Sequence, residues 1–419
     1  MFYLNLNFIN KISRTFFPFY KNSEIKFVFK KLEKDNTNKQ RSAMFVGGCV
    51  RKYLSNKDVD DIDIATSLTT DQIKEKFRDT KFKVIDSGIK HGTVTLVSDN
   101  LKLEITTLRK DIKTDGRHAE IEYTDDWQKD SERRDFTINA IYLDINGKIF
   151  DPQGGVNDLK NHQVKFIGDP QKRIQEDYLR IIRLIRFSLE YESEIDLKTI
   201  ENIKLNLDGI KIISKERILS ELFKILSIKN FSKINSNKNI KDLFSLIFPE
   251  FIKMNRLKKL EEISINMKFS KEILLSIMLI DEKDNHEYFS HKYNISSSLK
   301  DQLDLIAKNF KNLQIDKNFF LSNLRKNAYF FGKKHLLALN TLYFSINKKK
   351  LNDYLILTKK INNLNVPKFI FDGNFLKKNG MNQGASIGKT LKLIEQEWLN
   401  NNFKVSDKKV LQIIEDQKN

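Results

Sequence analysis

The sequence is poor in the residues that cross-link a chain or interrupt its helices. Its 419 residues include one cysteine, Cys49, five prolines and 15 glycines. A single cysteine excludes a disulfide within the chain and a cysteine-based zinc site, and it is typical of a reducing compartment. No apolar run approaches the roughly 18 residues of a membrane-spanning helix. We therefore expect neither disulfides nor a membrane partner.

Acidic residues are missing from the first 23 positions, which carry Lys11, Arg14 and Lys21. Organelle transit segments have such a composition. A plain N-terminal extension has it too, and the segment lacks a clear amphipathic pattern. Both interpretations stand, so the sequence predicts a bacterial cytoplasmic protein or a mitochondrial one.

Positive charge is in excess, with 74 Lys and Arg against 55 Asp and Glu, which gives a net charge of +19. Such an excess attracts polyanions and favours contacts with phosphate groups, so nucleic acid is the expected partner. The alternative is a coding bias toward lysine, asparagine and isoleucine, which says less about partners.

Two kinds of pattern divide the chain. The first part, to about Gly168, mixes helical and strand patterns, with a capping box at Thr69 and Gln72 that predicts a helix over residues 71–78. The predicted strands there are Phe45–Val46, Thr93–Val97, Leu101–Leu108 and Ile138–Leu143. After Gly168 the apolar residues recur at helical spacing, first over residues 172–190. The sequence thus predicts an α+β part followed by an all-helical part.

The densest group of chemically competent residues lies in the α+β part. Gly47 and Gly48 precede Arg51, and a glycine pair lets backbone N–H groups approach a phosphate while the arginine supplies a charged fork. Asp61 and Asp63 are two apart in a predicted strand, so their side chains point to the same face. Two such carboxylates repel each other unless a cation lies between them, and Mg²⁺ suits carboxylates combined with substrate phosphates. Either motif alone is usually a turn or a solvated strand end, but together they predict a metal–triphosphate site.

Glu104 lies on a predicted strand between apolar neighbours. It is a candidate third acid on the same metals. An exposed strand glutamate is the equally weighted alternative.

A second group contains Arg133, Arg134, Asp135 and Asn139. Tandem arginines can hold triphosphate oxygens while the aspartate orients them, and Asn139 can read a ribose hydroxyl. The plain alternative is an ion pair at the entrance of a strand.

A third group contains Asp177, Arg180, Arg183 and Arg186. On a helix, Asp177 and Arg180 are surface neighbours, so they can offer an acceptor and a donor to the edge of a base. Arg183 and Arg186 continue in steps of three and can reach phosphates. A ladder of ion pairs is the commonplace alternative.

In order and spacing these residues resemble the class II nucleotidyltransferases, which include CCA-adding enzymes and bacterial poly(A) polymerases. The motifs that carry the resemblance, between residues 41 and 190, are GGCVR, DIDIAT, HGTVTLV, EITTLR, TDGRHAE, RRDFTINA and EDYLRIIRLIRF. The form of TDGRHAE and of the DDWQKDSERRDFTINA that follows is closest to the alphaproteobacterial and mitochondrial CCA-adding branch.

The resemblance implies a DNA polymerase beta-like head, a mixed sheet with flanking helices, followed by an all-α neck, body and tail. The implied parts are an N-terminal extension at 1–40, the head at 41–169, the neck with a nucleotide-selecting helix at 170–235, the body at 236–360 and a tRNA-binding tail at 361–419.

The resemblance also implies residue roles. Asp61 and Asp63 would bind two Mg²⁺ ions, with Glu104 as the candidate third catalytic acid. The implied nucleotide-binding residues are Gly48, Arg51 and Arg134 for phosphates, Asn139 for the ribose, Asp177 and Arg180 for the base, and Arg183 and Arg186 as their support.

The implied activity is addition of C, C and A to the 3′ end of tRNA from CTP and ATP, with the acceptor arm on the basic helical half. One departure is visible, because Lys52 stands where the family has aspartate, which changes the surroundings of Arg51. Two alternatives are a poly(A) polymerase or partial CC- or A-adding enzyme, and a tRNA-binding protein without catalytic activity.

Overall fold

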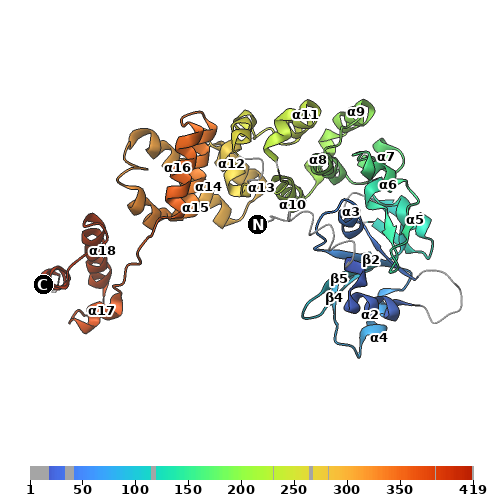
Figure 1. The fold of residues 1–419 in the computed structure, drawn as a ribbon, viewed down its shortest axis with the longest axis horizontal. Coiled ribbons are helices and arrows are strands. Elements are labelled where there is room, and N and C mark those ends of the chain that lie inside the picture. The colour runs from blue at the N-terminus through green and yellow to red at the C-terminus, as the bar shows by residue number, and fades with distance from the viewer. Residues whose placement is uncertain are drawn as a thin grey trace, which may run out of the picture. The chain divides into compact units, whose positions relative to one another are not determined.

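A computed structural model describes residues 18–33, 42–114, 119–229, 231–263, 268–281, 283–382 and 384–417. The chain forms two compact units, Met1–Glu250 and Phe251–Asn419, each described by itself below (Figure 1). The described strands all lie in the first unit, and the second unit is helical. This arrangement confirms the predicted fold class, an α+β part followed by helices.

The first unit contains a seven-stranded mixed sheet in the order β3-β4-β5-β2-β1-β8-β9. β2 and β5 run parallel, and the other neighbouring strands are antiparallel. The strands are β1 (Ala43–Val46), β2 (Ile62–Thr66), β3 (Lys83–Gly88), β4 (Thr93–Val97), β5 (Lys102–Thr107), β8 (Tyr142–Leu143) and β9 (Ile149–Phe150). A separate antiparallel ribbon consists of β6 (Arg109–Thr114) and β7 (Ala119–Tyr123). Within the TDGRHAE motif, residues 115–118 lie outside the described residues.

Most predicted strands are present, but the prediction over Ile138–Leu143 is wrong for most of its length. Residues Thr137–Asn139 form a short 3₁₀ helix, and only Tyr142–Leu143 pair in the sheet. Ile138, Ala140 and Ile141 are nevertheless fully buried. Burial of irregular backbone therefore produced the apolar pattern that predicted a strand.

The helices of the first unit surround the sheet and continue past it. They are α2 (Ser23–Leu32), α3 (Gly48–Leu54), α4 (Thr70–Phe77), α5 (Trp127–Glu132), α6 (Gly155–Lys160), α7 (Pro170–Glu176), α8 (Leu179–Tyr191), α9 (Leu197–Leu205), α10 (Lys215–Leu226) and α11 (Lys238–Ile247). The 3₁₀ helices are η1 (Phe19–Lys21), η2 (Ile89–His91), η3 (Thr137–Asn139), η4 (Leu207–Ile212) and η5 (Phe231–Ser236). The predicted capping box is present at the start of α4.

Helix α2 lies within the segment predicted as an N-terminal extension, yet it packs on the head. Its Phe29 ring lies 4.5 Å from the ring of Phe45 in β1, and Ile25, Val28 and Leu32 are buried. The head therefore uses residues upstream of its predicted start.

The helix predicted over residues 172–190 is two helices. α7 ends at Glu176, Asp177 has an extended backbone with φ −158°, and α8 begins at Leu179. The Leu179 N–H donates to the Asp177 carboxylate at 3.1 Å, a local turn that aspartate favours over helix continuation.

The second unit is a set of packed helices that ends in a small tail cluster. Its elements are η6 (Met254–Glu262), α12 (Lys271–Leu279), α13 (Asn285–Tyr293), α14 (Ser297–Ile315), α15 (Leu324–Ser345), α16 (Leu351–Asn362), α17 (Gly373–Lys378), α18 (Ala385–Asn400) and α19 (Asp407–Asp416). The tail has its own core of Leu376, Met381, Ile394, Val410 and Ile414. Among the described residues, no helix combines the length and apolar character that crossing a membrane requires.

Candidate active site

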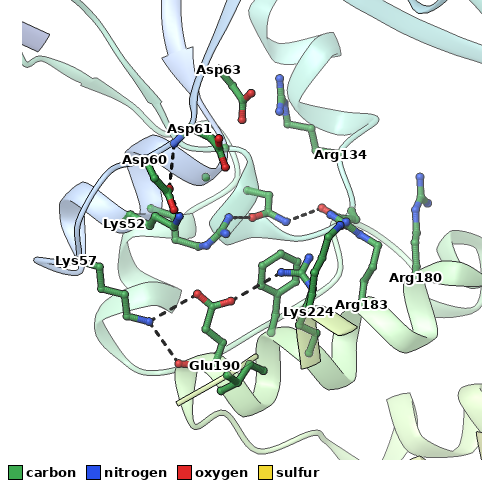
Figure 2. A pocket seen from close by; sticks show the side chains of 18 of the residues that line it. Lys52, Lys57, Asp60, Asp61, Asp63, Arg134, Arg180, Arg183, Glu190 and Lys224 are labelled. Atoms are coloured by element: carbon green, nitrogen blue, oxygen red, sulfur yellow. Dashed lines mark hydrogen bonds and ion pairs between the residues drawn. The ribbon is translucent and has the colours of Figure 1, made fainter. Parts of the chain in front are cut away.

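Two aspartates lie at the start of β2, in the middle of the sheet. Asp63 is inside the strand and Asp61 is one residue before it, while Ile62 and Ile64 point into the core. Both carboxyl groups line a cavity of about 1560 Å³ in the first unit. Figure 2 shows them on the same side of the strand, with the Arg134 guanidinium facing Asp63. The alternation of the strand thus brings the two acids together.

The surroundings of Asp63 favour a bound cation. Burial raises the pKa of Asp63 to about 6, and the nearby Glu104 carboxylate adds to this rise, against the lowering effect of Arg134. A divalent ion would relieve both the burial and the repulsion. Within the described ranges, no cluster of three or more His, Cys, Asp or Glu side chains forms a complete metal site. Two carboxylates completed by substrate phosphates fit a hard divalent ion.

Glu104 is opposite Asp63 on the parallel neighbour β5. Its side chain is half exposed, and Lys102 lies 3.9 Å from its carboxylate. It is therefore close enough to raise the pKa of Asp63, while half of its side chain faces solvent.

The glycine pair forms the turn between β1 and α3. Gly47 has φ +72°, a left-handed conformation that favours glycine, and α3 begins at Gly48. A Cβ atom on Gly47 would lie 3.7 Å from Asp63 Oδ2, and one on Gly48 would lie 4.0 Å from the same atom. The backbone thus passes directly beside the carboxylate, with space left for a phosphate.

Arg51 is 6% exposed and its hydrogen bonds are made inside the protein. Its Nε donates to the Tyr191 hydroxyl at 2.8 Å, and Nη1 donates to Asn139 Oδ1. The guanidinium lies over the Phe187 ring at 4.6 Å. Asn139 in turn donates to Asp135 at 2.8 Å. Two predicted nucleotide-binding residues are therefore held by each other at the wall of the cavity.

Asp130 anchors both tandem arginines, and sequence reasoning missed it. This fully buried carboxylate accepts hydrogen bonds from Arg133 at 2.8 Å, Arg134 at 3.0 Å and the Tyr142 hydroxyl at 2.7 Å. Burial raises the pKa of Asp130, but the guanidinium groups of Arg134 and Arg133 outweigh it and lower the pKa to about 2. Arg133 and Arg134 follow Asp130 by three and four residues, a spacing that predicts ion pairs on a helix and could have identified Asp130 from the sequence.

Asp177 and Arg180 both line the cavity, but among the described contacts they are joined only by a backbone hydrogen bond, from the Arg180 N–H to the Asp177 carbonyl at 3.0 Å, and their side chains have other partners. Asp177 accepts from Arg217 of α10 at 2.7 Å, and Arg180 donates to Glu176 at 2.5 Å. The prediction that Asp177 and Arg180 share a helix surface is wrong, because Asp177 lies in the break before α8. Glu176 and Arg217 were not singled out from the sequence.

Arg183 and Arg186 project from α8 onto acidic partners. Arg183 donates to Asp135 at 2.8 Å, and Arg186 donates to Glu221 of α10 at 2.7 Å. Glu221 is 3% exposed, a buried charge among cations. The apolar period of α10 places residue 221 on the buried face, which was the signal that could have found it.

Comparison with known proteins agrees with this geometry. The Poly A polymerase head domain matches residues 43–165, and the Probable RNA and SrmB- binding site of polymerase A matches residues 194–254. The matched head domain places the chain among the nucleotidyltransferases.

Relatives along most of the chain are more specific. Human mitochondrial CCA tRNA nucleotidyltransferase 1 is 35% identical over 377 residues, 88% of this chain and 85% of the human protein. The CCA-adding enzyme of Lactobacillus helveticus is 32% identical over 386 residues, 89% of this chain and 93% of that enzyme. The Bacillus stearothermophilus CCA-adding enzyme, solved in complex with CTP, shares the fold with a TM-score of 0.69 at 22% identity, over 93% of this chain and 96% of that one. The chain belongs to the CCA tRNA nucleotidyltransferase family, an enzyme family that depends on divalent metal.

Proposed function

We propose that this chain adds C, C and A to the 3′ end of tRNA, using CTP and ATP without a nucleic-acid template and releasing pyrophosphate. The observation that carries the proposal is the convergence of Asp61 and Asp63 on one cavity beside the Gly47–Gly48 turn and the Arg134 fork. The family membership of nearly the whole chain supports the same reaction.

In this proposal Asp61 and Asp63 hold Mg²⁺, with Glu104 as a third acid beside them. Mg²⁺ held there would supply the positive charge that favours ionisation of the attacking RNA 3′-hydroxyl and departure of pyrophosphate. The Gly48 backbone N–H and the Arg134 fork bind the triphosphate. Arg134 can bind the triphosphate because the Asp130 carboxylate fixes the orientation of its guanidinium group.

In the same proposal, the residues at the junction between α7 and α8 select the nucleotide. Asn139, oriented by Arg51 and Asp135, contacts the ribose. Asp177 and Arg180 offer an acceptor and donors to the base edge, with Arg183 and Arg186 as support. Because Asp177 and Arg180 already have ionic partners, base binding exchanges these contacts instead of filling vacant groups. Because each base must replace an existing ion pair, the affinity for any single base stays modest, and the same residues can bind either C or A.

We further propose a function for each part predicted from the sequence. The neck at 170–235 presents Asp177 and Arg180 to the nucleotide, and the body and tail at 236–419 bind the tRNA acceptor arm. The net charge of +19 supports a contact with the phosphate backbone. Binding of tRNA should therefore weaken steeply as salt rises. A bacterial source places the enzyme in the cytoplasm, and a eukaryotic source places it in the mitochondrion.

The experiment that tests the activity uses purified full-length chain and tRNA lacking its last three residues, with CTP, ATP or both. We expect two C residues from CTP alone, a complete CCA from both nucleotides, and a single A from ATP on tRNA ending in CC. A long ATP-only tail would identify a poly(A) polymerase, and addition that stops at CC with both nucleotides present would identify a partial enzyme.

A further inference from the structure

Lys52, the residue that departs from the family pattern, has a partner in the structure. Its ammonium group forms an ion pair with Asp60 Oδ1, and both side chains line the cavity (Figure 2). The same oxygen, Oδ1, accepts the backbone N–H of Asp61 at 2.9 Å. One carboxylate oxygen thus joins the side chain of α3 to the backbone of the first metal-binding aspartate.

The position of Asp61 explains why such a tie matters. Asp63 lies inside β2, where it pairs with Glu104 of β5, and the pairing of β2 with β1 begins at the next residue, Ile64. Asp61 lies one residue before the strand, and the ladder to β5 begins only at Ile62. Among the described contacts, the partner of the Asp61 backbone N–H is the Asp60 carboxylate oxygen that also binds Lys52.

Helix α3 is a suitable anchor for this link. It begins at Gly48, in the turn that we propose binds the triphosphate, so its position is set by the same backbone that passes Asp63. Lys52 is therefore placed to fix the position of Asp61 relative to that turn. The ion pair is partly exposed, with 25% of the Lys52 side chain and 68% of the Asp60 side chain accessible. Such pairs contribute little to folding stability, so the effect belongs to the site geometry.

We propose that the Lys52–Asp60 ion pair positions Asp61 for metal binding, and that Lys52 requires the acidic partner because its charge is opposite to that of the family aspartate. This inference rests on the proposed function, in which Asp61 is a metal ligand. Neither residue touches the reacting atoms in this role, so each is a positioning residue.

The alternative role for Lys52 is direct contact with a phosphate, since its ammonium also borders the cavity. Substitution of each partner separates the two roles. K52M removes the ammonium group, whereas D60N removes the charge that binds Lys52 but keeps an oxygen that can accept the Asp61 N–H. Loss of positioning impairs both variants, whereas loss of a phosphate contact impairs K52M alone.

The test compares full-length wild type, K52M, D60N and K52M/D60N by two readouts. One is the Mg²⁺ concentration for half-maximal CTP incorporation into tRNA lacking CCA, and the other is Mn²⁺ affinity measured by electron paramagnetic resonance with CTP present. We expect each single variant to need about tenfold more metal, as is usual when a residue behind a metal ligand is lost, and the double variant to need no more metal than either single variant. Melting temperature and tRNA affinity should stay unchanged.

A matched control is K74D, which breaks the similarly exposed ion pair between Lys74 of α4 and Asp86 of β3. It should leave both readouts at wild-type values. A wild-type metal response in K52M or in D60N would overturn the proposal, as would a double variant in which the two losses multiply. A wild type that binds Mn²⁺ but adds no CCA would refute the proposed function alone, because the Mn²⁺ readout still tests the ion pair.

Discussion

Gly47 is the single residue whose conformation places the most constraint on the site. Both Gly47 and Gly154 have positive φ values, +72° and +71°, so alanine strains the backbone at either position. The strain is larger at Gly47, because its ψ of −125° lies outside the left-handed helical region in which Gly154 lies with ψ 20°. Only at Gly47 does the added methyl meet the site, 3.7 Å from Asp63 Oδ2, whereas at Gly154 nothing lies within 4 Å.

We therefore predict that G47A and G154A both lose melting temperature, G47A more than G154A, but that only G47A loses nucleotide incorporation, by about tenfold or more. Steady-state incorporation of CTP at a temperature well below both melting transitions measures this. Equal loss of activity in the two variants would show that backbone strain, and not space beside Asp63, explains the glycine.

His335 in the second unit gives the chain a defined sensitivity to acid. Burial lowers its pKa to about 4 from an ordinary 6.5, and its Nε2 lies 3.0 Å from Asn309 Nδ2. The unfolded chain therefore binds more protons between these values, so the stability contributed by neutral His335 is complete above about pH 6.5 and is lost as pH falls toward 4.

H335Q should remove that part of the acid sensitivity, worth up to about 3 kcal/mol, while keeping an acceptor for Asn309. Thermal unfolding of wild type and variant at about pH 7.5 and about pH 5 compares them. H291Q, at an exposed histidine, is the control. If the difference in melting temperature between the two pH values were the same in H335Q as in wild type, the assignment of this acid sensitivity to His335 would be contradicted.

Residues whose arrangement follows from local geometry could be predicted, although Asp130, which also has local partners, was missed. Residues whose partners are distant in sequence could not be predicted. Asp61 and Asp63 share a face because strands alternate, and the glycine pair must turn wherever it stands. Arg217 and Glu221 reach the site from α10 only after the chain has folded back on α8. A single sequence has no periodicity that reports such a contact.

At the scale of elements, the short helix α5 orients the tandem arginines that follow it. Asp130 lies on it, fully buried, and Glu132 two residues later is exposed and accepts from Gln128. Replacing the buried carboxylate leaves Arg133 and Arg134 without their anchor.

D130N is therefore expected to raise the KM for CTP and ATP by about tenfold and to destabilise the head by about 3 kcal/mol. E132Q should change neither quantity. Titration of both nucleotides at low temperature, where D130N is still folded, separates the two effects. A D130N enzyme that is less stable but binds nucleotides with unchanged KM would show that Asp130 serves folding alone.

The junction between α7 and α8 is held from outside by η4. Tyr178 packs against Gly209, where an added Cβ would lie 2.1 Å from the ring. Alanine at 209 must displace Tyr178 and with it the neighbouring Asp177 and Arg180.

We predict that G209A reduces the discrimination among nucleotides more than it reduces the total rate, because the base-reading pair moves while the carboxylates stay in place. The ratio of CTP to UTP incorporation measures the effect. G388A, in α18 with nothing within 4 Å of the added methyl, is the matched control. A G209A enzyme that keeps its discrimination would place base selection elsewhere.

The same junction shows where helix periodicity fails. Apolar spacing runs unbroken from Ile174 through Ile181 and Leu184, which predicts one helix. The Asp177 carboxylate ends that helix by accepting the Leu179 N–H. Periodicity records which residues are buried, and it cannot register a local turn that leaves the burial pattern intact.

At the scale of the whole molecule, the division into an α+β part and a helical part was readable because strand and glycine patterns stop near Gly168. The start of the head was less readable. Helix α2 is short, and its amphipathic face is recognised as part of the core only when Phe45 lies opposite it.

The function of the whole chain depends on Asp61 and Asp63 acting together on a divalent ion beside the triphosphate. The most direct measurement is Mn²⁺ binding in the presence of CTP, combined with CTP incorporation into tRNA lacking CCA, for wild type, D61N and D63N. We predict that each substitution abolishes the bound ion and lowers incorporation by several orders of magnitude while tRNA affinity is kept. Wild-type metal binding and turnover in either variant would contradict the account.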